Sequence, residues 1–249
     1  SSLILFALLF TLAGAPHADD HAAVGAAANA AAGALAPVGD PPPATPDEAL
    51  ENLIAGNLRF TAGKPRHRHE SANWRASLTK SQHPFAIILT CADSRVPVEL
   101  LFDQGFGDLF TVRVAGNVAS KDTDGSILYA VRHLHTKLLL VMGHESCGAV
   151  AAALKYDELK GKEPKAIMDL LDFIVPAVSA VDHKAPTGDQ MFEGVKANVR
   201  NTIKELRKDA DLLEAEKKGE LKIVGGVYEI STGKMVRVLD HVPSASPSK

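Results

Sequence analysis

Two short polar motifs, each placed directly after an apolar run, constrain this chain more than any other feature. The motif Thr90–Arg95 follows the run Pro84–Leu89, and the motif Gly143–Gly148 follows Lys137–Met142. Short apolar runs bounded by polar and small residues predict buried strands. The only two cysteines of the chain therefore lie just beyond the ends of two strands.

The residue types in the two motifs predict a metal site. Asp93 follows Cys91 by two residues and His144 precedes Cys147 by three, so two thiolates, an imidazole and a carboxylate can surround one ion. Thiolates with imidazole favour zinc over calcium, magnesium or manganese, and three protein ligands with one open position are typical of catalytic zinc. A disulfide and two buried spectator thiols are the alternatives. The adjacent histidine and the Cys-x-Asp-x-Arg context favour the metal.

These motifs resemble those of the β-class carbonic anhydrases. The resemblance extends over about Pro46 to Leu239. Its residues are Cys91-x-Asp93-x-Arg95, His144-x-x-Cys147-Gly148, Gln82, Phe110–Asn117 and Gly125–Val131.

The resemblance implies an activity and the roles of five residues. Cys91, His144 and Cys147 would bind one Zn²⁺, whose fourth ligand is water or hydroxide, and zinc lowers the pKa of bound water from 15.7 to near 7. Asp93 would orient the zinc hydroxide, and Arg95 would hold Asp93 off the metal in a bidentate pair. Without that pairing, Asp93 becomes the fourth ligand and closes the site. The implied reaction is the reversible hydration of CO2 to bicarbonate and a proton.

Five further residues match family positions around the substrate. Gln82 would donate its amide N–H to a substrate oxygen, and Phe110, Ala115 and Tyr129 would line an apolar pocket. Ala115 is smaller than the valine common at its position. Gly148 lets backbone approach the site closely, and a role in helix packing is equally open.

Ile88 distinguishes between two subgroups of the family. A subgroup that closes its site on binding bicarbonate carries tryptophan at this position, so Ile88 together with Gln82 indicates the open, plant-like subgroup. Hydrolysis of carbonyl sulfide or carbon disulfide on the same scaffold is a rival activity. A zinc or thiol sensor without turnover is a rival from another class, and the Asp93–Arg95 pair argues against it.

Alternating strands and helices predict the fold class, an α/β protein with a mostly parallel sheet flanked by helices. The resemblance implies strand order 2-1-3-4, and Ser231–Lys234 predicts a turn into an antiparallel edge strand, Met235–Leu239. We expect Lys165–Val181 to form one helix.

Four segments are expected along the 249 residues: a signal peptide (1–22), an Ala/Pro-rich disordered linker (23–45), a catalytic domain (46–242) and a disordered tail (243–249). The apolar run Leu3–Leu12 has the length of a signal-peptide core, which predicts export to a bacterial periplasm, with a retained membrane anchor as the alternative. A net charge of −3 gives no electrostatic case for nucleic acid. The basic stretch Lys64–His69 is expected to be a solvated loop.

The first helix of the catalytic domain is expected to contribute to assembly. Thr45 and Pro46 are typical of a helix start, and Gly63 ends the helix. An apolar stripe on one face needs a partner surface. Its members are Leu50, Leu53, Ile54, Asn57 and Leu58. In the resembled family this N-terminal helical arm packs across a second subunit, which implies a homodimer or a dimer of dimers.

Overall fold

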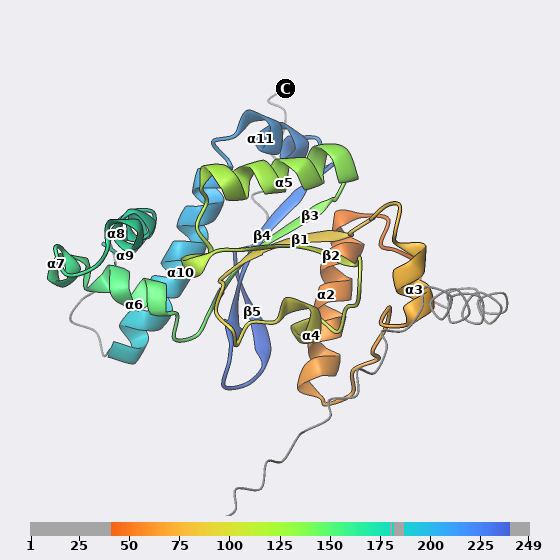
Figure 1. The fold of residues 1–249 in the computed structure, drawn as a ribbon, viewed down its shortest axis with the longest axis horizontal. Coiled ribbons are helices and arrows are strands. Elements are labelled where there is room, and N and C mark those ends of the chain that lie inside the picture. The colour runs from red at the N-terminus through yellow and green to blue at the C-terminus, as the bar shows by residue number, and fades with distance from the viewer. Residues whose placement is uncertain (1–40, 180, 182–186, 240–249) are drawn as a thin grey trace, which may run out of the picture. The chain divides into compact units, whose positions relative to one another are not determined.

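A five-stranded sheet forms the centre of the unit that the structure describes (Figure 1). In the computed structural model, residues 41–179, 181 and 187–239 are described. The strand order is β2-β1-β3-β4-β5; the first four strands are parallel and β5 runs antiparallel to β4. Their bounds are β1 (Ala86–Thr90), β2 (Leu109–Arg113), β3 (Leu138–His144), β4 (Lys222–Glu229) and β5 (Lys234–Leu239). The predicted order and the antiparallel edge are confirmed.

The helices alternate with the strands along the chain. They are α2 (Pro46–Thr61), α3 (Ala72–Ser77), α4 (Val98–Leu101), the 3₁₀ turn η1 (Ala115–Asn117), α5 (Lys121–Leu134), α6 (Gly148–Leu154), α7 (Tyr156–Leu159), α8 (Lys165–Leu171), α9 (Val175–Val178), α10 (Thr187–Leu206) and α11 (Ala210–Lys217). At the start of α2, Thr45 caps the Glu48 amide and the Glu48 carboxylate accepts from the Thr45 amide in return. This capping box satisfies two backbone donors and fixes where the domain's first helix begins.

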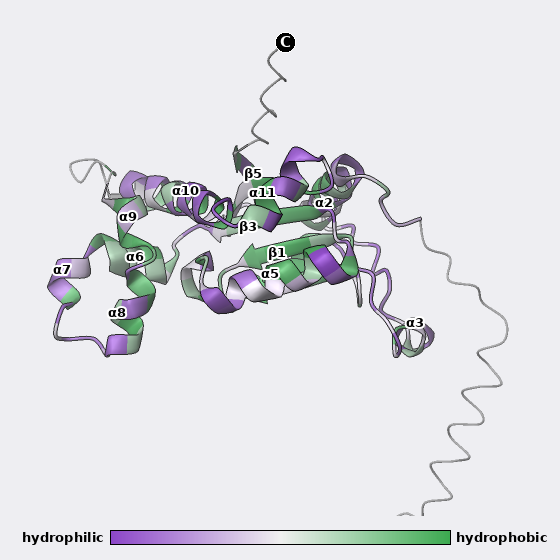
Figure 2. Cartoon of the chain, turned by 90° about the horizontal axis from the view of Figure 1, so that it is seen from above, coloured by the Kyte–Doolittle hydropathy of each residue, from purple (hydrophilic) through white to green (hydrophobic). Residues whose placement is uncertain are grey.

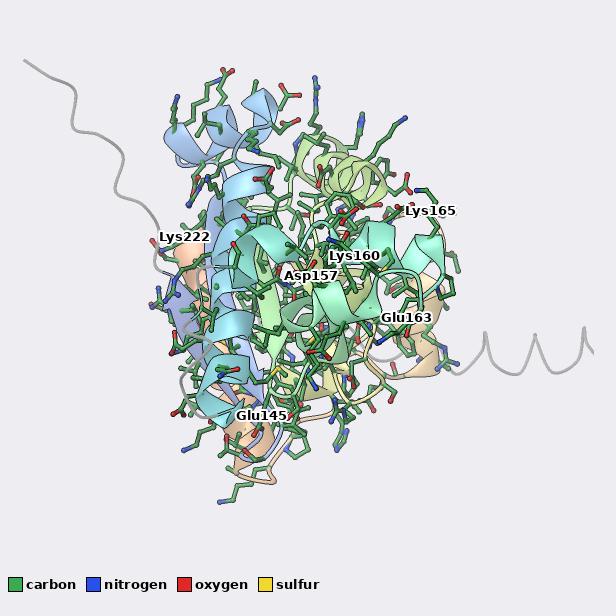
Figure 3. All side chains as sticks on the ribbon, turned by 90° about the vertical axis from the view of Figure 1, so that its left-hand side faces the viewer. Glu145, Asp157, Lys160, Glu163, Lys165 and Lys222 are labelled. Atoms are coloured by element: carbon green, nitrogen blue, oxygen red, sulfur yellow. The ribbon has the colours of Figure 1, made fainter. Side chains whose placement is uncertain are left out.

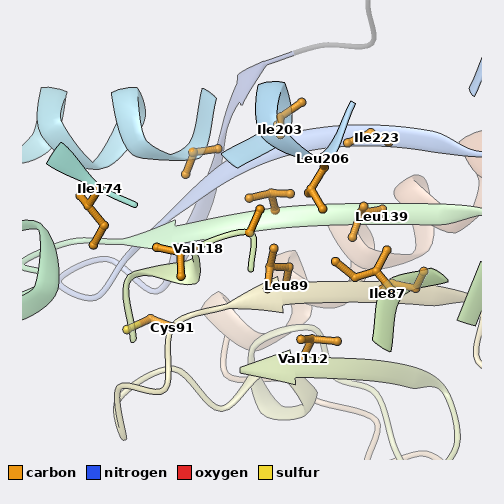
Figure 4. Packing of buried hydrophobic residues seen from close by; sticks show 14 of the residues in the cluster. Ile87, Leu89, Cys91, Val112, Val118, Leu139, Ile174, Ile203, Leu206 and Ile223 are labelled. Carbon is orange, nitrogen blue, oxygen red and sulfur yellow. The ribbon is translucent and has the colours of Figure 1, made fainter. Parts of the chain in front are cut away.

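Alternate residues of the central strands supply two separate apolar cores. Ile87 and Leu89 of β1 pack on one side with residues of α5, α10 and α11. Figure 4 shows them in one cluster with Ile203 and Leu206 of α10. Ile88 and Leu140 pack on the other side with α2 and α4. Side chains alternate across a strand, and helices cover both faces of β1 and β3, so every position of these two strands is buried and their sequences are continuous apolar runs. The hydropathy colouring shows these apolar strands between the helices (Figure 2).

The register of the sheet brings the two predicted motifs together. Thr90 pairs with Met142, so Cys91 and His144 leave β1 and β3 at the same edge. From β1 the strand order runs to β2 on one side of the sheet, and the next strands, β3 and β4, are added on the other side. The order therefore reverses between β1 and β3, which is the switch point of the sheet. Parallel α/β sheets bind ligands at such a point, beyond the carboxyl ends of the strands.

The apolar stripe of α2 is largely covered by its own chain. Leu50 and Leu53 are buried in the core that contains Ile88. The Asn57 side chain donates its Nδ2 to Leu101 O and Gly233 O, and its Oδ1 accepts the Met235 backbone amide. The partner surface that the stripe needs is therefore supplied largely within the chain, because α2 packs over the sheet face that contains Ile88. Leu58, 63% exposed, is the large apolar side chain of the stripe that remains uncovered.

The segment expected to be one helix from Lys165 to Val181 is broken. α8 ends at Leu171, and α9 begins only at Val175, with Pro176 in its first turn. Proline lacks the amide that a continuous helix would need there. The helices α6 to α9 form a side of the molecule that carries many charged groups, such as the Asp157–Lys160 pair at 2.7 Å (Figure 3).

The basic loop is also more ordered than its composition predicts. His69 stacks on Trp74 with ring centroids 3.8 Å apart, and its Nδ1 lies 2.7 Å from Asp108. Asp103 accepts the backbone amides of Arg66 and His67. These contacts hold the loop against the segment before β2, so His69 is not a solvated residue.

The expected signal peptide, most of the expected linker and the expected tail lie outside the described residues. Ala44 and Thr45, at the end of the expected linker, take part in capping α2. Among the helices that the structure describes, none has the length and apolar character required to cross a membrane.

Candidate metal centre

Cys91, His144 and Cys147 converge at the carboxyl edge of the sheet. One ligand atom from each lies within 4.8 Å of the others, and all three residues are buried. Cys91 lies just past the end of β1 (Figure 4), His144 is the last residue of β3, and Cys147 precedes the first residue of α6. A tight turn through Ser146, which has φ of 55°, carries the chain from His144 to Cys147.

The His144 ring is oriented as a metal ligand. Its Nδ1 lies 2.9 Å from the Glu145 carbonyl, which can only accept a hydrogen bond, so the proton resides on Nδ1. Nε2 is left with its lone pair, buried and without a hydrogen-bond partner in the described part of the chain. A buried, unsatisfied imidazole nitrogen facing two thiols fits a metal ion, because a cation would occupy the space between them.

The two thiols behave as a pair. A hydrogen bond from Cys147 lowers the pKa of Cys91, and the Gly116 amide lowers it further. The same hydrogen bond raises the pKa of Cys147, and burial raises it again. A bound cation would take the place of the proton in this hydrogen bond, because cysteines bind metals as thiolates.

Asp93 lies beside this cluster but is held by Arg95. The Arg95 Nε and Nη2 groups donate to the two oxygens of Asp93 at 2.9 and 2.8 Å, and the Arg95 amide donates at 2.9 Å. These bonds hold the pKa of the Asp93 carboxyl well below its usual range. Asp93 Oδ2 lies 3.8 Å from His144 Nε2, so the ionised carboxylate faces the cluster without completing it.

Two residues that the sequence did not single out shape the loop after β1. Arg113, the last residue of β2, donates to Cys91 O at 3.2 Å and to Asp93 O at 2.5 Å. Gly116 donates its amide to Cys91 Sγ at 3.3 Å. Both residues lie in Phe110–Asn117, a stretch that resembles the β-class carbonic anhydrases, but nothing in the sequence indicated which of their atoms would contact the loop after β1.

Glu145 anchors the second motif to the turn before β5. Its Oε2 accepts the Ser231 amide at 2.9 Å, and its own amide donates to Tyr228 O at 2.8 Å. The bond from Ser231 lowers the pKa of Glu145. Glu145 lies on the same charged side of the molecule as α6 (Figure 3). The motif is thereby fixed to β4 and to the β4–β5 turn.

Of the predicted substrate residues, two lie at the metal edge, the carboxyl edge of the sheet where the Cys-His-Cys cluster lies. Ala115 follows β2 closely and Gly148 begins α6, directly after Cys147. A Cβ at Gly148 would meet nothing within 4 Å, so packing inside the chain does not require glycine there.

The other three predicted substrate residues lie elsewhere. Phe110 pairs with Ile87 of β1. Ile87 lies four residues before Cys91, so Phe110 is about 13 Å from the level of Cys91 along the strand direction. The Tyr129 ring lies 6.3 Å from the Phe110 ring, and Gln82 shares with Tyr129 a depression of about 670 Å³. A single chain therefore does not bring these three residues to the metal cluster.

The fold and the cluster define a class of protein: an α/β protein with a Cys-His-Cys cluster that could hold a metal ion, at the switch point of a mostly parallel sheet. The family model described as carbonic anhydrase matches residues 86–235. The chain belongs to the carbonic anhydrase family, in its β class.

Individual relatives agree with this assignment. "Carbonic anhydrase 2" of Mycobacterium tuberculosis (strain H37Rv) is 38% identical over 202 residues, which cover 81% of this chain and 96% of the relative. A carbonic anhydrase of Mycolicibacterium smegmatis is 38% identical, covering 78% and 94%. Among solved structures, the β-carbonic anhydrase CcaA superimposes with a TM-score of 0.64 at 25% identity, covering 76% and 94%. The Coccomyxa β-carbonic anhydrase in complex with acetazolamide gives 0.62 at 27% identity, covering 67% and 77%.

Proposed function

We propose that this chain is a zinc-dependent carbonic anhydrase that catalyses the reversible hydration of CO2 to bicarbonate and a proton. The observation that carries the proposal is the buried His144 Nε2, which has no hydrogen-bond partner within residues 41–179, 181 and 187–239 and faces Cys91 and Cys147 beside the Asp93–Arg95 pair. Two thiolates and an imidazole are ligands that suit zinc. Zinc bound there would supply Lewis acidity, lowering the pKa of water toward neutrality.

Each residue of the centre has a role that follows from its contacts. The Glu145 carbonyl fixes the His144 tautomer. The Asp93 carboxylate stays ionised and can accept a hydrogen bond from a water molecule beside the metal ligands. Arg95 engages both Asp93 oxygens and so keeps the carboxylate from becoming a ligand, which supports assignment to the open subgroup.

Stopped-flow CO2 hydration, with zinc content assayed in parallel, tests the proposal. We expect about one zinc per chain and turnover that rises between neutral pH and about pH 8.5, because two thiolates make the bound water less acidic than neutral ligands would. Zinc without turnover would redirect the assignment to carbonyl sulfide or carbon disulfide hydrolysis, or to a sensor. Absence of both zinc and free thiols would indicate a disulfide.

We further propose that the active unit is a homodimer or a dimer of dimers in which a second copy completes each site. Gln82, Phe110 and Tyr129 lie too far from the metal cluster of their own chain, while Tyr129 is 48% exposed and Leu58 of α2 is exposed as well. A second copy could present its Gln82 and Tyr129 to the metal edge.

A complementation experiment tests this shared site. Tyr129→Ala and Cys147→Ala should each be inactive alone. In a mixed dimer, one site combines an intact metal cluster from the first variant with an intact Tyr129 from the second, so co-refolding should restore part of the activity. Absence of any recovery in mixtures shown to contain mixed dimers would contradict the shared site.

Export to the periplasm is also a proposal, supported by the apolar run Leu3–Leu12 followed by small residues. The N-terminal sequence of the protein recovered from fractionated cells tests it. A periplasmic protein that begins within about twenty residues downstream of the run supports cleavage. Cytoplasmic recovery with the run intact would contradict export, and recovery with membranes would indicate a retained anchor.

A further inference from the structure

The Cys91 sulfur is held by a backbone donor from a residue with an unusual conformation. Gly116 has φ of 71° and donates its amide to Cys91 Sγ at 3.3 Å. A Cβ there would lie 2.5 Å from Ile174 Cδ1 and 3.2 Å from Ala149 Cβ. The position of this amide therefore depends on packing that leaves no space for a side chain. Hydrogen bonds to ligand atoms orient the ligand and tune its donor strength.

The other side of Gly116 is held by a side chain from a distant helix. Asn198 of α10 donates its Nδ2 to Gly116 O at 2.7 Å, across 82 positions of sequence. The bond is buried, and Asn198 is 1% exposed. The carbonyl and the amide of one glycine are thus both engaged, so the two bonds together restrain the peptide planes that meet at the Gly116 Cα.

In the described ranges, Asn198 satisfies only one of its two side-chain polar atoms. Asn198 Oδ1 is buried and has no hydrogen-bond partner among the described residues. A buried, unsatisfied acceptor destabilises the folded state, so the bond from the Asn198 Nδ2 to the buried Gly116 carbonyl has to offset this cost. The polar group at position 198 is better explained by its one bond to Gly116 O.

We infer that Asn198 is a positioning residue of the metal centre: it orients Gly116 so that the Gly116 amide donates to the Cys91 sulfur. The inference rests on the proposed metal-binding role of Cys91. It assigns to α10, which supplies no metal ligand, control over the donor strength and position of one thiolate.

Cadmium substitution of the full chain tests the inference independently of catalysis. The ¹¹³Cd chemical shift reports the donor strength of the bound thiolates, and chelator competition reports zinc affinity. In Asn198→Leu, which keeps the branching of the side chain and removes the donor, we expect a changed ¹¹³Cd shift and zinc affinity about tenfold weaker. Asn198→Ala, which cannot clash with its neighbours, should give the same changes and serves if the leucine variant fails to fold.

Asn201→Leu is the matched control. Asn201 lies one turn along α10 and also donates its Nδ2 to a backbone carbonyl, that of Phe173 at 3.3 Å, away from the cluster. Its ¹¹³Cd shift and zinc affinity should equal those of the wild type. Wild-type values in both Asn198 variants would overturn the inference. Failure of the wild-type chain to bind either metal would overturn the proposed function instead.

Discussion

The Arg95 guanidinium holds both oxygens of the Asp93 carboxylate, with Nε–Oδ1 at 2.9 Å and Nη2–Oδ2 at 2.8 Å. A third bond, from Arg95 Nη2 to Ser146 O at 3.3 Å, ties this pair to the turn between His144 and Cys147. The same pair thus connects the loop after β1 to the loop after β3. It also keeps a carboxylate near the cluster without letting it become a ligand.

Removal of the guanidinium should close the site. In Arg95→Ala, Asp93 is free to move the short distance from its present 3.8 Å separation from His144 Nε2 to the open metal position. We expect zinc content to be retained and CO2 hydration at neutral pH to fall by about 100-fold or more. Stopped-flow turnover together with metal analysis checks this.

Asp93→Asn separates the two contributions of the pair. An amide is a weaker ligand and a weaker acceptor than a carboxylate, so this variant should keep zinc and still lose most turnover. Wild-type turnover in either variant would remove the pair from the mechanism.

Loss of one thiolate should abolish metal binding. Cys147→Ala leaves His144 and Cys91 as two ligands in a buried site, and we expect less than about one tenth of the wild-type zinc content and no turnover. Ser146→Ala is the control, because Ser146 contributes its backbone carbonyl to Arg95 while its side chain is exposed. Full zinc and full activity in the cysteine variant would refute the ligand assignment.

Two glycines at the metal edge should respond differently to alanine. Gly116→Ala forces a left-handed conformation on a residue with a Cβ and drives that Cβ into Ile174, so we expect a loss of about 3 kcal/mol of unfolding free energy. Gly148→Ala should leave stability within about 0.5 kcal/mol of the wild type, because its Cβ meets no atom within 4 Å. Chemical denaturation measures both.

The Gly148 variant then answers a second question. If its turnover falls while its stability is unchanged, Gly148 is needed for substrate or for the second subunit. Equal stability losses in the two variants would contradict the packing argument for Gly116.

A pH dependence of stability is expected from Asp124, in the first turns of α5 and remote from the metal ligands. Burial raises the pKa of Asp124. The folded chain therefore holds this proton more tightly than the unfolded chain, so the contribution to stability is present at low pH and is lost as the pH rises through the folded pKa. Asp124→Asn should match the wild type at about pH 3 and become more stable toward neutral pH. The gain should not exceed about 0.5 kcal/mol, because solvent screens a half-exposed carboxylate.

Asp122→Asn provides the comparison for Asp124. Asp122 lies in the same first turn but is exposed, and its charge favours the helix N-terminus. Its removal should lower stability slightly at neutral pH. A stability difference between Asp124→Asn and the wild type that does not change with pH would contradict the burial argument.

Several features of this protein were predictable because they depend on short sequence patterns. The strands β1 and β3 read as apolar runs because both of their faces are covered, and the parallel α/β class follows from their alternation with helices. The helix expected from Lys165 to Val181 was wrong because Pro176 interrupts a pattern that is otherwise helical. The stripe of α2 was visible in the sequence, whereas the surface that covers it was not.

The sequence by itself determined which ligand chemistry is present: two thiols, an imidazole and a carboxylate–guanidinium pair within short motifs at strand ends. Only the tertiary structure decided which atoms meet. It left His144 Nε2 without a partner in the part of the chain that is described, placed Gly116 against Cys91 across 25 positions and Asn198 against Gly116 across 82. It also separated Gln82 and Tyr129 from the metal edge. Local patterns fix residue types and backbone direction, but contacts between distant segments depend on how the helices pack on the sheet, which no short pattern encodes.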